Sequence, residues 1–173
     1  MDVNLGLLIL RLVLAALLWG HAMQKLFGWF RGQGVRKTAA LFEQWGLRPG
    51  FPFVVLSGAS ELVAGALIIL GAAIPLSTAI VVGSMSVAIA FNLPHGLWAH
   101  LGGYEVALVY ALLGIVIGVA GPGDWSMDAA LGMSGLHGPF WTLGAIALGL
   151  AGAAVPISLR TITVTRARQD PAA

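Results

Sequence analysis

Five of the ionisable side chains that interrupt or border otherwise apolar stretches of this sequence are expected to lie in the same half of the molecule. They are His21 and Lys25 in the first stretch, Glu61 in the second, His95 after the third, and Glu105 at the start of the fourth. An ionisable group in an apolar environment costs so much free energy that each one predicts a functional role or a structural partner. An imidazole beside a carboxylate is a combination that can bind ligands or relay protons. These five residues are therefore the candidate site.

The positions of His21 and Glu61 predict that their side chains lie at one level. Counted at about 1.5 Å per residue from the same side of the molecule, His21 is roughly 9 Å deep and Glu61 roughly 12 Å deep. Either the two form a hydrogen-bonded pair that fixes helix register, or they belong to a proton-active or ligand-binding pocket. Lys25, near a helix end, can instead extend to the membrane surface. His95 follows a Leu-Pro pair, so a loop histidine is the simpler interpretation there.

Arg11 lies in the other half of the first stretch, roughly 9 Å from its far end. Two arrangements are open for its guanidinium. It reaches across toward Glu61, or it extends outward to the membrane surface. We favour the second, because a long cationic side chain can bury its stem while its charge stays in water.

The histidines do not predict a metal or haem site. No two of them have the i, i+3 or i+4 spacing of helical metal ligands. The sequence contains no Cys, which excludes a disulfide, a thiolate zinc site, a thioether-linked haem and a Cys nucleophile. It also lacks a phosphate loop, a dinucleotide fingerprint and a nucleophile elbow, so the chemistry of soluble enzymes is not expected.

The elements that carry these residues are predicted to be membrane helices. Of 173 residues, 58% are hydrophobic and only 9% are charged, whereas a soluble domain has about a quarter charged residues. Five apolar runs have the length that crosses a bilayer as a helix. They cover residues 5–27, 53–71, 75–93, 104–121 and 139–159. The predicted fold class is an all-α, polytopic membrane bundle in contact with the lipid bilayer, and the net charge of only +2 disfavours a nucleic-acid partner.

The predicted organisation has three parts. Residues 1–130 form a four-helix membrane core, residues 131–160 add a fifth, C-terminal transmembrane helix, and residues 161–173 form a basic cytoplasmic tail. Between the first two spans, apolar residues recur at helical spacing, which predicts an amphipathic helix at 35–46 on the cytoplasmic interface. A solvated connector is the alternative for this segment.

The basic residues predict the orientation. With five antiparallel spans, seven Lys or Arg outside the spans fall on one side of the membrane and none on the other. The seven are Arg31, Arg36, Lys37, Arg48, Arg160, Arg166 and Arg168. The other side carries Asp2, Asp124 and Asp128. Cytoplasmic segments are enriched in Lys and Arg, so we expect the N-terminus outside and the C-terminus in the cytoplasm. The first run is too long for a signal peptide and is expected to be retained.

Several short segments carry a resemblance to a known family. They are Leu-Arg-Leu-Val-Leu at 10–14, Trp-Gly-His-Ala-Met-Gln-Lys-Leu-Phe-Gly at 19–28, Phe-Glu-Gln-Trp-Gly-Leu at 42–47, Asn-Leu-Pro-His-Gly at 92–96, Gly-Gly-Tyr-Glu at 102–105 and Gly-Pro-Gly-Asp-Trp-Ser-Met-Asp at 121–128. Together they resemble the DoxX family of small bacterial and archaeal membrane proteins. The His-x-x-x-Lys-Leu-Phe-Gly motif within the second segment is the most specific.

The resemblance implies a four-helix core, from which the fifth span departs, and a location in the plasma membrane of a prokaryote. It also implies a redox setting. The family takes its name from a subunit of an archaeal thiosulfate:quinone oxidoreductase, and actinobacterial members have been linked to a membrane complex with a sulfurtransferase and a superoxide dismutase. His21, Lys25, Glu61 and Glu105 match family positions, but no catalytic role transfers to them.

These observations support three hypotheses about function. In the first, the protein is a membrane subunit of a redox or oxidative-stress complex, with an oxidoreductase as partner and quinone as the cofactor in a polar pocket of the cytoplasmic leaflet. In the second, it is a small transporter in which Glu61 moves protons or a solute. In the third, it is a scaffold whose buried ion pair serves only stability. The lack of broken helices or repeats disfavours transport, and the converging titratable groups disfavour a scaffold.

Overall fold

The computed structural model describes residues 3–133 and 135–169, and within these ranges the regular structure is helical. The elements are α1 (Val3–Phe27), α2 (Gly34–Gln44), α3 (Gly50–Leu70), α4 (Ile74–Asn92), the 3₁₀ turns η1 (Leu93–His95) and η2 (Ala99–Leu101), α5 (Glu105–Ala120), α6 (Met127–Ala130) and α7 (Pro139–Gln169). The predicted all-α membrane bundle is confirmed.

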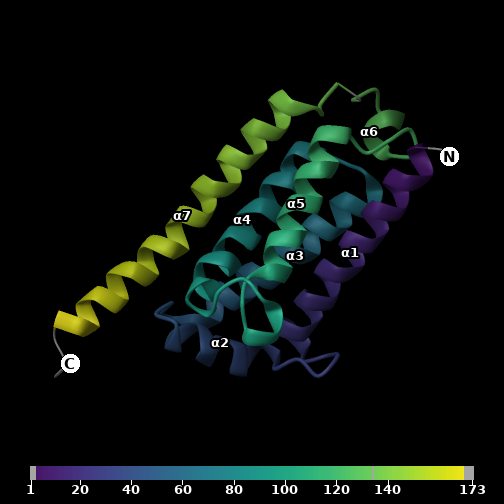
Figure 1. Cartoon of the computed structure of the whole chain (residues 1–173). Helices are drawn as coiled ribbons and strands as arrows, with labels where there is room; N and C mark the ends of the chain where they lie inside the picture. Colours follow the sequence, from purple (N-terminus) through teal and green to yellow (C-terminus); the bar gives the residue numbers. More distant parts are fainter. Residues whose placement is uncertain (1–2, 134, 170–173) are drawn as a thin grey trace.

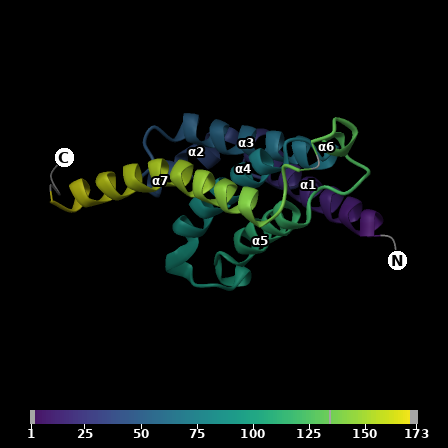
Figure 2. The same ribbon diagram turned by 90° about the horizontal axis from the view of Figure 1, so that it is seen from above.

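The long helices run side by side, and two short helices mark the ends of the bundle (Figure 1). Helix α4 is central, because it packs against α3, α5 and α7. Helix α2 lies at one end, which we call the α2 end, and α6 lies at the other, the α6 end. Seen from above, the loop that carries η1 and η2 projects away from α2 (Figure 2). The described chain starts at the α6 end and finishes at the α2 end.

In the part of the chain that the structure describes, four helices are long and apolar enough to cross a membrane, namely α1, α3, α4 and α7. Their outward side chains are apolar as well, as at Leu12 and Leu148, which suits contact with lipid. Helix α5 is apolar but has only 16 residues, about 24 Å at 1.5 Å per residue, less than the hydrocarbon thickness of about 30 Å. The η1–η2 loop lies beside its start, at the α2 end (Figure 1).

The helix predicted at 35–46 is present as α2, and the last helix is longer than predicted. Helix α7 continues to Gln169, so the described part of the expected tail at 161–173 is helical. The physical reason lies in the sequence, which has no Gly or Pro between Leu159 and Gln169 to end the helix. Asp2 and residues 170–173 lie outside the described residues.

Arg11 and Asp128 hold the turn between α3 and α4 at the α6 end. Arg11 donates from Nε to the Ile68 carbonyl at 2.9 Å and from Nη2 to the Ile69 carbonyl at 2.5 Å, so it binds carbonyls of the last turn of α3. The Ile68 carbonyl also accepts the Gly71 backbone N–H at 3.1 Å. The carboxylate of Asp128 accepts the backbone N–H groups of Ala73 and Ile74 at 2.8 and 3.1 Å, at the start of α4. A cation at a helix C-terminus and an anion at an N-terminus are each favourable.

The expectation that Arg11 extends to the membrane surface is wrong. Its side chain is 2% exposed and also donates from Nη1 to the carbonyls of Pro122 and Trp125, at 2.7 and 2.9 Å. It does turn toward the α6 end rather than toward Glu61. Protein carbonyls replace the water that a surface arginine would bind, which is possible because the loop after α5 folds back over the α3–α4 turn.

Helices α4 and α7 approach closely through glycines. A Cβ atom at Gly149 would lie 2.5 Å from the Ala79 carbonyl oxygen, and one at Gly83 would lie 3.0 Å from the Gly149 carbonyl oxygen. Small residues at a membrane helix interface let backbones approach in this way. This contact places α7 against the bundle core, where it contributes a wall to the cavity described next.

Candidate functional site

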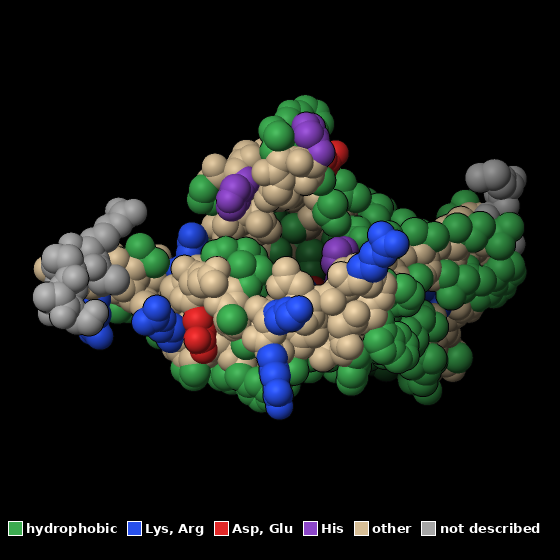
Figure 3. Space-filling view, turned by 90° about the horizontal axis from the view of Figure 1, so that it is seen from below, with side chains coloured by type: hydrophobic (Ala, Val, Ile, Leu, Met, Phe, Trp, Pro, Cys, Tyr) green, Lys and Arg blue, Asp and Glu red, His purple; other side chains and the backbone are tan. Residues whose placement is uncertain are grey.

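A cavity of about 600 Å³ lies in the half of the bundle nearest the α2 end. Helices α1, α2, α3, α4, α5 and α7 all contribute to its walls, which are mostly apolar. In the space-filling view from below, a hollow separates the projecting loop with its histidines from the α2 side, where Lys and Arg side chains stand out (Figure 3). The cavity therefore combines an apolar interior with a basic surface nearby.

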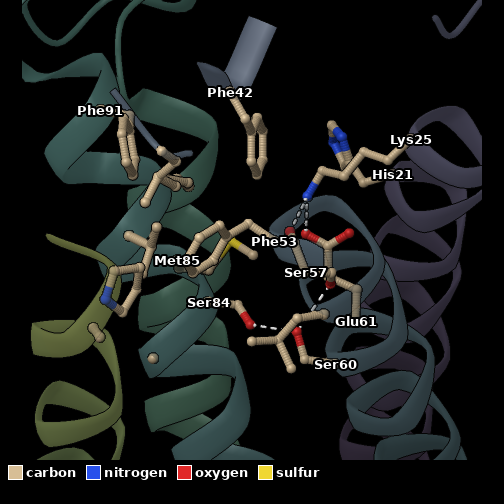
Figure 4. Close-up of a pocket in the computed structure, with 18 of the residues that line it drawn as sticks. His21, Lys25, Phe42, Phe53, Ser57, Ser60, Glu61, Ser84, Met85 and Phe91 are labelled. Carbon is tan, nitrogen blue, oxygen red and sulfur yellow. Dashed lines mark hydrogen bonds and ion pairs between the residues drawn. The ribbon is translucent and has the colours of Figure 1, made fainter. Parts of the chain in front are cut away.

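A buried ion pair forms the polar wall of the cavity. Lys25 Nζ donates to Glu61 Oε1 at 2.6 Å and to Ser57 Oγ at 3.0 Å. Ser57 and Glu61 are one turn apart on α3, so both face Lys25 on α1, as the close-up shows (Figure 4). The side chain of Glu61 is 2% exposed and that of Lys25 is 24% exposed. Lys25 does not simply extend to the surface; its ammonium neutralises a carboxylate inside the bundle.

One oxygen of this carboxylate is unmatched. Glu61 Oε2 is fully buried and has no hydrogen-bond partner among the residues that the structure describes. Most buried polar atoms in folded proteins do have a partner, and a buried acceptor without one costs free energy. The unmatched oxygen therefore distinguishes this ion pair from a closed structural salt bridge.

His21 lines the cavity one turn before Lys25, but its close partner is not Glu61. Its ring contacts that of Tyr110 on α5 edge to face, with centroids 5.5 Å apart. Of the two roles left open for His21 and Glu61, the hydrogen-bonded pair is not the observed arrangement, because Lys25 takes that place. The sequence alone did not single out Tyr110, since a tyrosine within an apolar run carries no charge signal.

A second polar contact lies deeper on the same wall. The hydroxyl groups of Ser60 on α3 and Ser84 on α4 are 3.0 Å apart, and Ser60 also donates to the Ser57 carbonyl at 2.9 Å. Ser57 and Ser60 lie on the face of α3 that carries Glu61, as their spacing along the helix requires. The sequence alone did not single out Ser84, because only the packing of α3 on α4 brings that side chain to the cavity.

Aromatic side chains form the wall at the α2 end. The rings of Phe42, Trp45 and Phe91 stack, with centroid separations of 5.7 to 6.4 Å. Arg160 of α7 lies 4.7 Å above the Phe91 ring and donates to the carbonyls of Trp45 and Ala90 at 3.1 and 3.2 Å. A cation over a ring face is attractive, so this one arginine joins α2, α4 and α7.

The structure brings three of the five candidate residues together and leaves two apart. His21, Lys25 and Glu61 line the cavity, whereas His95 and Glu105 are not part of its wall. His95 is exposed in η1. Glu105 Oε2 accepts the Ala99 backbone N–H at 2.9 Å and so ties the η2 turn to the start of α5. Within the described residues, no group of three His, Asp or Glu side chains is arranged to hold a metal ion.

Comparison with protein-family models matches residues 6–101 to the model described as DoxX. This segment runs from α1 through η2 and contains the ion pair, the serines and the aromatic stack, but not α5 or α7. Neither the comparison with curated proteins nor the one with solved structures gave a match. The matched segment covers more than half of the sequence and includes the helices that form the polar wall. The chain therefore belongs to the DoxX family of membrane proteins.

Proposed function

We propose that this protein holds a lipid-soluble small molecule in the cavity at the α2 end, and that the molecule is a quinone. The observation that carries the proposal is an apolar cavity of about 600 Å³ whose polar groups gather on one wall, at Lys25, Ser57 and Glu61. Binding sites for small molecules have volumes of roughly 300–1,000 Å³, an apolar lining and a few polar groups that fix orientation.

The side chains around the cavity fit a quinone head group. Lys25 carries three N–H donors, of which two are engaged by Ser57 and Glu61, so a third can meet a carbonyl oxygen. Phe53 and Tyr110 supply ring surfaces of the kind that stack with a flat conjugated ring. A bound quinone would supply reversible electron transfer. In this role the protein is a subunit of a redox complex, with an oxidoreductase as its partner.

The test is to fill the cavity with a larger side chain and to measure how much quinone analogue the protein binds. Ala88 of α4 lines the cavity, whereas Ala147 of α7 is exposed on the outside of the bundle. Wild type, Ala88→Phe and Ala147→Phe are reconstituted in nanodiscs with a short-chain ubiquinone analogue, and bound analogue is quantified against empty nanodiscs. We expect Ala88→Phe to lower the affinity about tenfold or more, or about 1.4 kcal/mol, and Ala147→Phe to leave it unchanged.

Two results would contradict the proposal. The first is that wild type binds no analogue beyond the empty nanodiscs. The second is equal retention by Ala88→Phe, in a sample whose helical content and elution volume match wild type. Purification of the wild type in mild detergent tests the partner separately, since the absence of any co-purifying oxidoreductase would contradict membership of a redox complex.

We favour binding over transport because a buried apolar layer separates the cavity from the α6 end. A buried apolar layer with Leu14, Ile68, Ile74 and Ile117 fills the half of the bundle nearest α6. Transport of a proton or a polar solute by Glu61 would need a path through this layer. Proton flux in liposomes that Glu61→Gln abolishes would reverse the preference.

We further propose that the protein lies in the plasma membrane of a prokaryote with the α2 end in the cytoplasm. Arg31, Arg36, Arg48 and Arg160 belong to the α2 end, and Asp124 and Asp128 belong to the α6 end. This distribution is the one that the preference for Lys and Arg in cytoplasmic segments predicts. The cavity would then open toward the cytoplasmic leaflet.

A further inference from the structure

Among the buried side-chain nitrogen and oxygen atoms of the described residues, Glu61 Oε2 is the one without a hydrogen-bond partner, and it is an acceptor. An ionised carboxylate only accepts hydrogen bonds. Glu61 Oε1 receives Lys25, while Oε2 receives nothing from the described residues. The hydroxyl groups of Ser60 and Ser84 are already hydrogen-bonded to each other. The remaining donor of Lys25 belongs to a side chain that is 24% exposed, so it is not forced to remain unpaired in the way that Oε2 is.

The charge of the wall also restricts what can bind there. Lys25 and Glu61 form a neutral pair at 2.6 Å inside an apolar cavity. A charged head group would leave one net charge in that cavity, which is costly without a further partner. A neutral head group avoids this cost. The wall therefore suits a neutral molecule that can donate a hydrogen bond to the carboxylate.

The carboxylate can meet such a donor with a small movement. The terminal torsion of a glutamate side chain is broad rather than confined to one narrow well. A turn about this torsion moves both carboxylate oxygens together, so Oε2 can approach a donor in the cavity while the flexible Lys25 side chain follows Oε1. The backbone of α3 and the ion pair then remain in place.

We propose that the cavity selects a lipid-soluble ligand whose neutral head group carries a hydroxyl donor, as in a phenol or quinol, over a ligand whose head group only accepts hydrogen bonds. This inference rests on the proposed binding function and names the chemical form that the site takes. For a quinone and its reduced partner, it assigns the tighter binding to the reduced, hydroxyl-bearing form, through a hydrogen bond from that hydroxyl to Glu61.

The experiment compares two probes that differ only at the donor, para-nonylphenol and para-nonylanisole. Each is equilibrated with nanodiscs that contain the full-length protein, and bound probe is corrected for partition into empty nanodiscs. A hydrogen bond to a charged group should make the phenol bind about ten- to a hundredfold more tightly than the ether to wild type. Glu61→Gln should bring this ratio close to one, because the amide can also donate to the ether oxygen.

Glu43→Gln is the matched control. Glu43 is an exposed carboxylate of α2 that accepts the Gly50 backbone N–H, a bond that the amide oxygen of Gln can still accept. The ratio of phenol to ether affinity in this variant should equal that of wild type. Infrared spectra of protein with isotope-labelled glutamate give a second readout that does not require Glu61→Gln to fold. The phenol should shift a glutamate carboxylate band in wild type and in Glu43→Gln, and the ether should not.

The outcomes separate the two proposals. Equal corrected affinity of wild type for phenol and ether, or tighter binding of the ether, would overturn the donor selectivity while the binding function stands. A preference for phenol that persists in folded Glu61→Gln would also overturn it, because the donor would then bind elsewhere. Failure of wild type to bind either probe or the ubiquinone analogue would contradict the binding function itself.

Discussion

At the scale of single residues, the ion pair between Lys25 and Glu61 is the central feature of this protein. Burying two charges costs desolvation free energy that their attraction repays only when the remaining polar atoms are satisfied. Here Oε1 of Glu61 has Lys25 and Oε2 has no described partner. The pair is therefore a poor device for stability alone, which favours a ligand-binding role over that of a scaffold.

Removal of one member of the pair should cost more stability than removal of both. Lys25→Met leaves the Glu61 carboxylate buried without its cation, and we expect a loss of about 2–3 kcal/mol in the free energy of unfolding. The double variant Lys25→Met, Glu61→Leu should recover most of this loss. Thermal unfolding of the helical circular dichroism signal in detergent measures both. Equal losses for single and double variants would show that the charges are not coupled.

Arg11 illustrates the opposite case, an ionisable residue whose donors are used by backbone carbonyls. Its guanidinium donates hydrogen bonds to the backbone carbonyls of Ile68, Ile69, Pro122 and Trp125. A lysine would keep the charge but has a single nitrogen, which cannot reach carbonyls on both sides of the site.

Arg11→Lys should therefore lower stability without changing ligand binding. Loss of hydrogen bonds to buried carbonyls predicts a decrease of about 2 kcal/mol or more in the free energy of unfolding, measured by thermal unfolding in detergent. The ratio of phenol to ether affinity should stay that of wild type, because Arg11 lies at the α6 end. Unchanged thermal stability would contradict the structural role.

At the scale of elements, α7 is the helix that completes the cavity. It lies against α4 through Gly83 and Gly149, and its Arg160 holds α2 and the aromatic stack. Residues such as Gly152 and Pro156 of α7 line the cavity. The segment that matches the family ends at residue 101, so α7 contributes a wall from outside that segment.

A side chain at Gly149 should separate α7 from α4. A Cβ atom there would lie 2.5 Å from the Ala79 carbonyl oxygen, which neither backbone can avoid without moving. We expect Gly149→Ala to lower the free energy of unfolding by about 1–3 kcal/mol. On the same helix, a Cβ atom at Gly144 would meet nothing within 4 Å, so Gly144→Ala should be neutral or slightly stabilising. Equal thermal stability of the two variants would contradict the close approach.

At the scale of the whole molecule, the two ends of the bundle differ in their polar contacts and in their packing. The α6 end is closed by a network in which Arg11 and Asp128 satisfy the helix termini. The α2 end carries the cavity, an amphipathic helix and most of the basic residues (Figures 1 and 3). In the proposed function, the α2 end would receive the ligand while the α6 end would anchor the fold.

The proposed orientation predicts which end is accessible from each side of the membrane. The sequence has no Cys, so single cysteines can be introduced without a background. In intact cells, a membrane-impermeant maleimide should label Met133→Cys, at the α6 end, and should label Arg166→Cys only after the membrane is opened. Labelling of Arg166→Cys in intact cells would show that the orientation is the reverse of the proposed one, and that the cavity faces the other leaflet.

Several features could be predicted from the sequence because they depend on composition and local spacing. The scarcity of charge indicated a membrane protein, and the apolar runs located α1, α3, α4, α5 and the start of α7 to within a few residues, because helix length in lipid follows from bilayer thickness. The spacing of apolar residues predicted α2 in the same way. Depth along the first two helices also placed His21, Lys25 and Glu61 in one half of the bundle.

The pairing of these residues depended on tertiary structure. Sequence positions give depth but not the rotation of one helix against another, so they could not decide that Lys25, and not His21, meets Glu61. Nor could they show that a loop folds over Arg11, that Ser84 and Tyr110 reach the cavity, or that His95 and Glu105 stay outside its wall. Composition and helix length are properties of single segments, whereas the cavity and its unmatched carboxylate oxygen exist only where six packed helices meet.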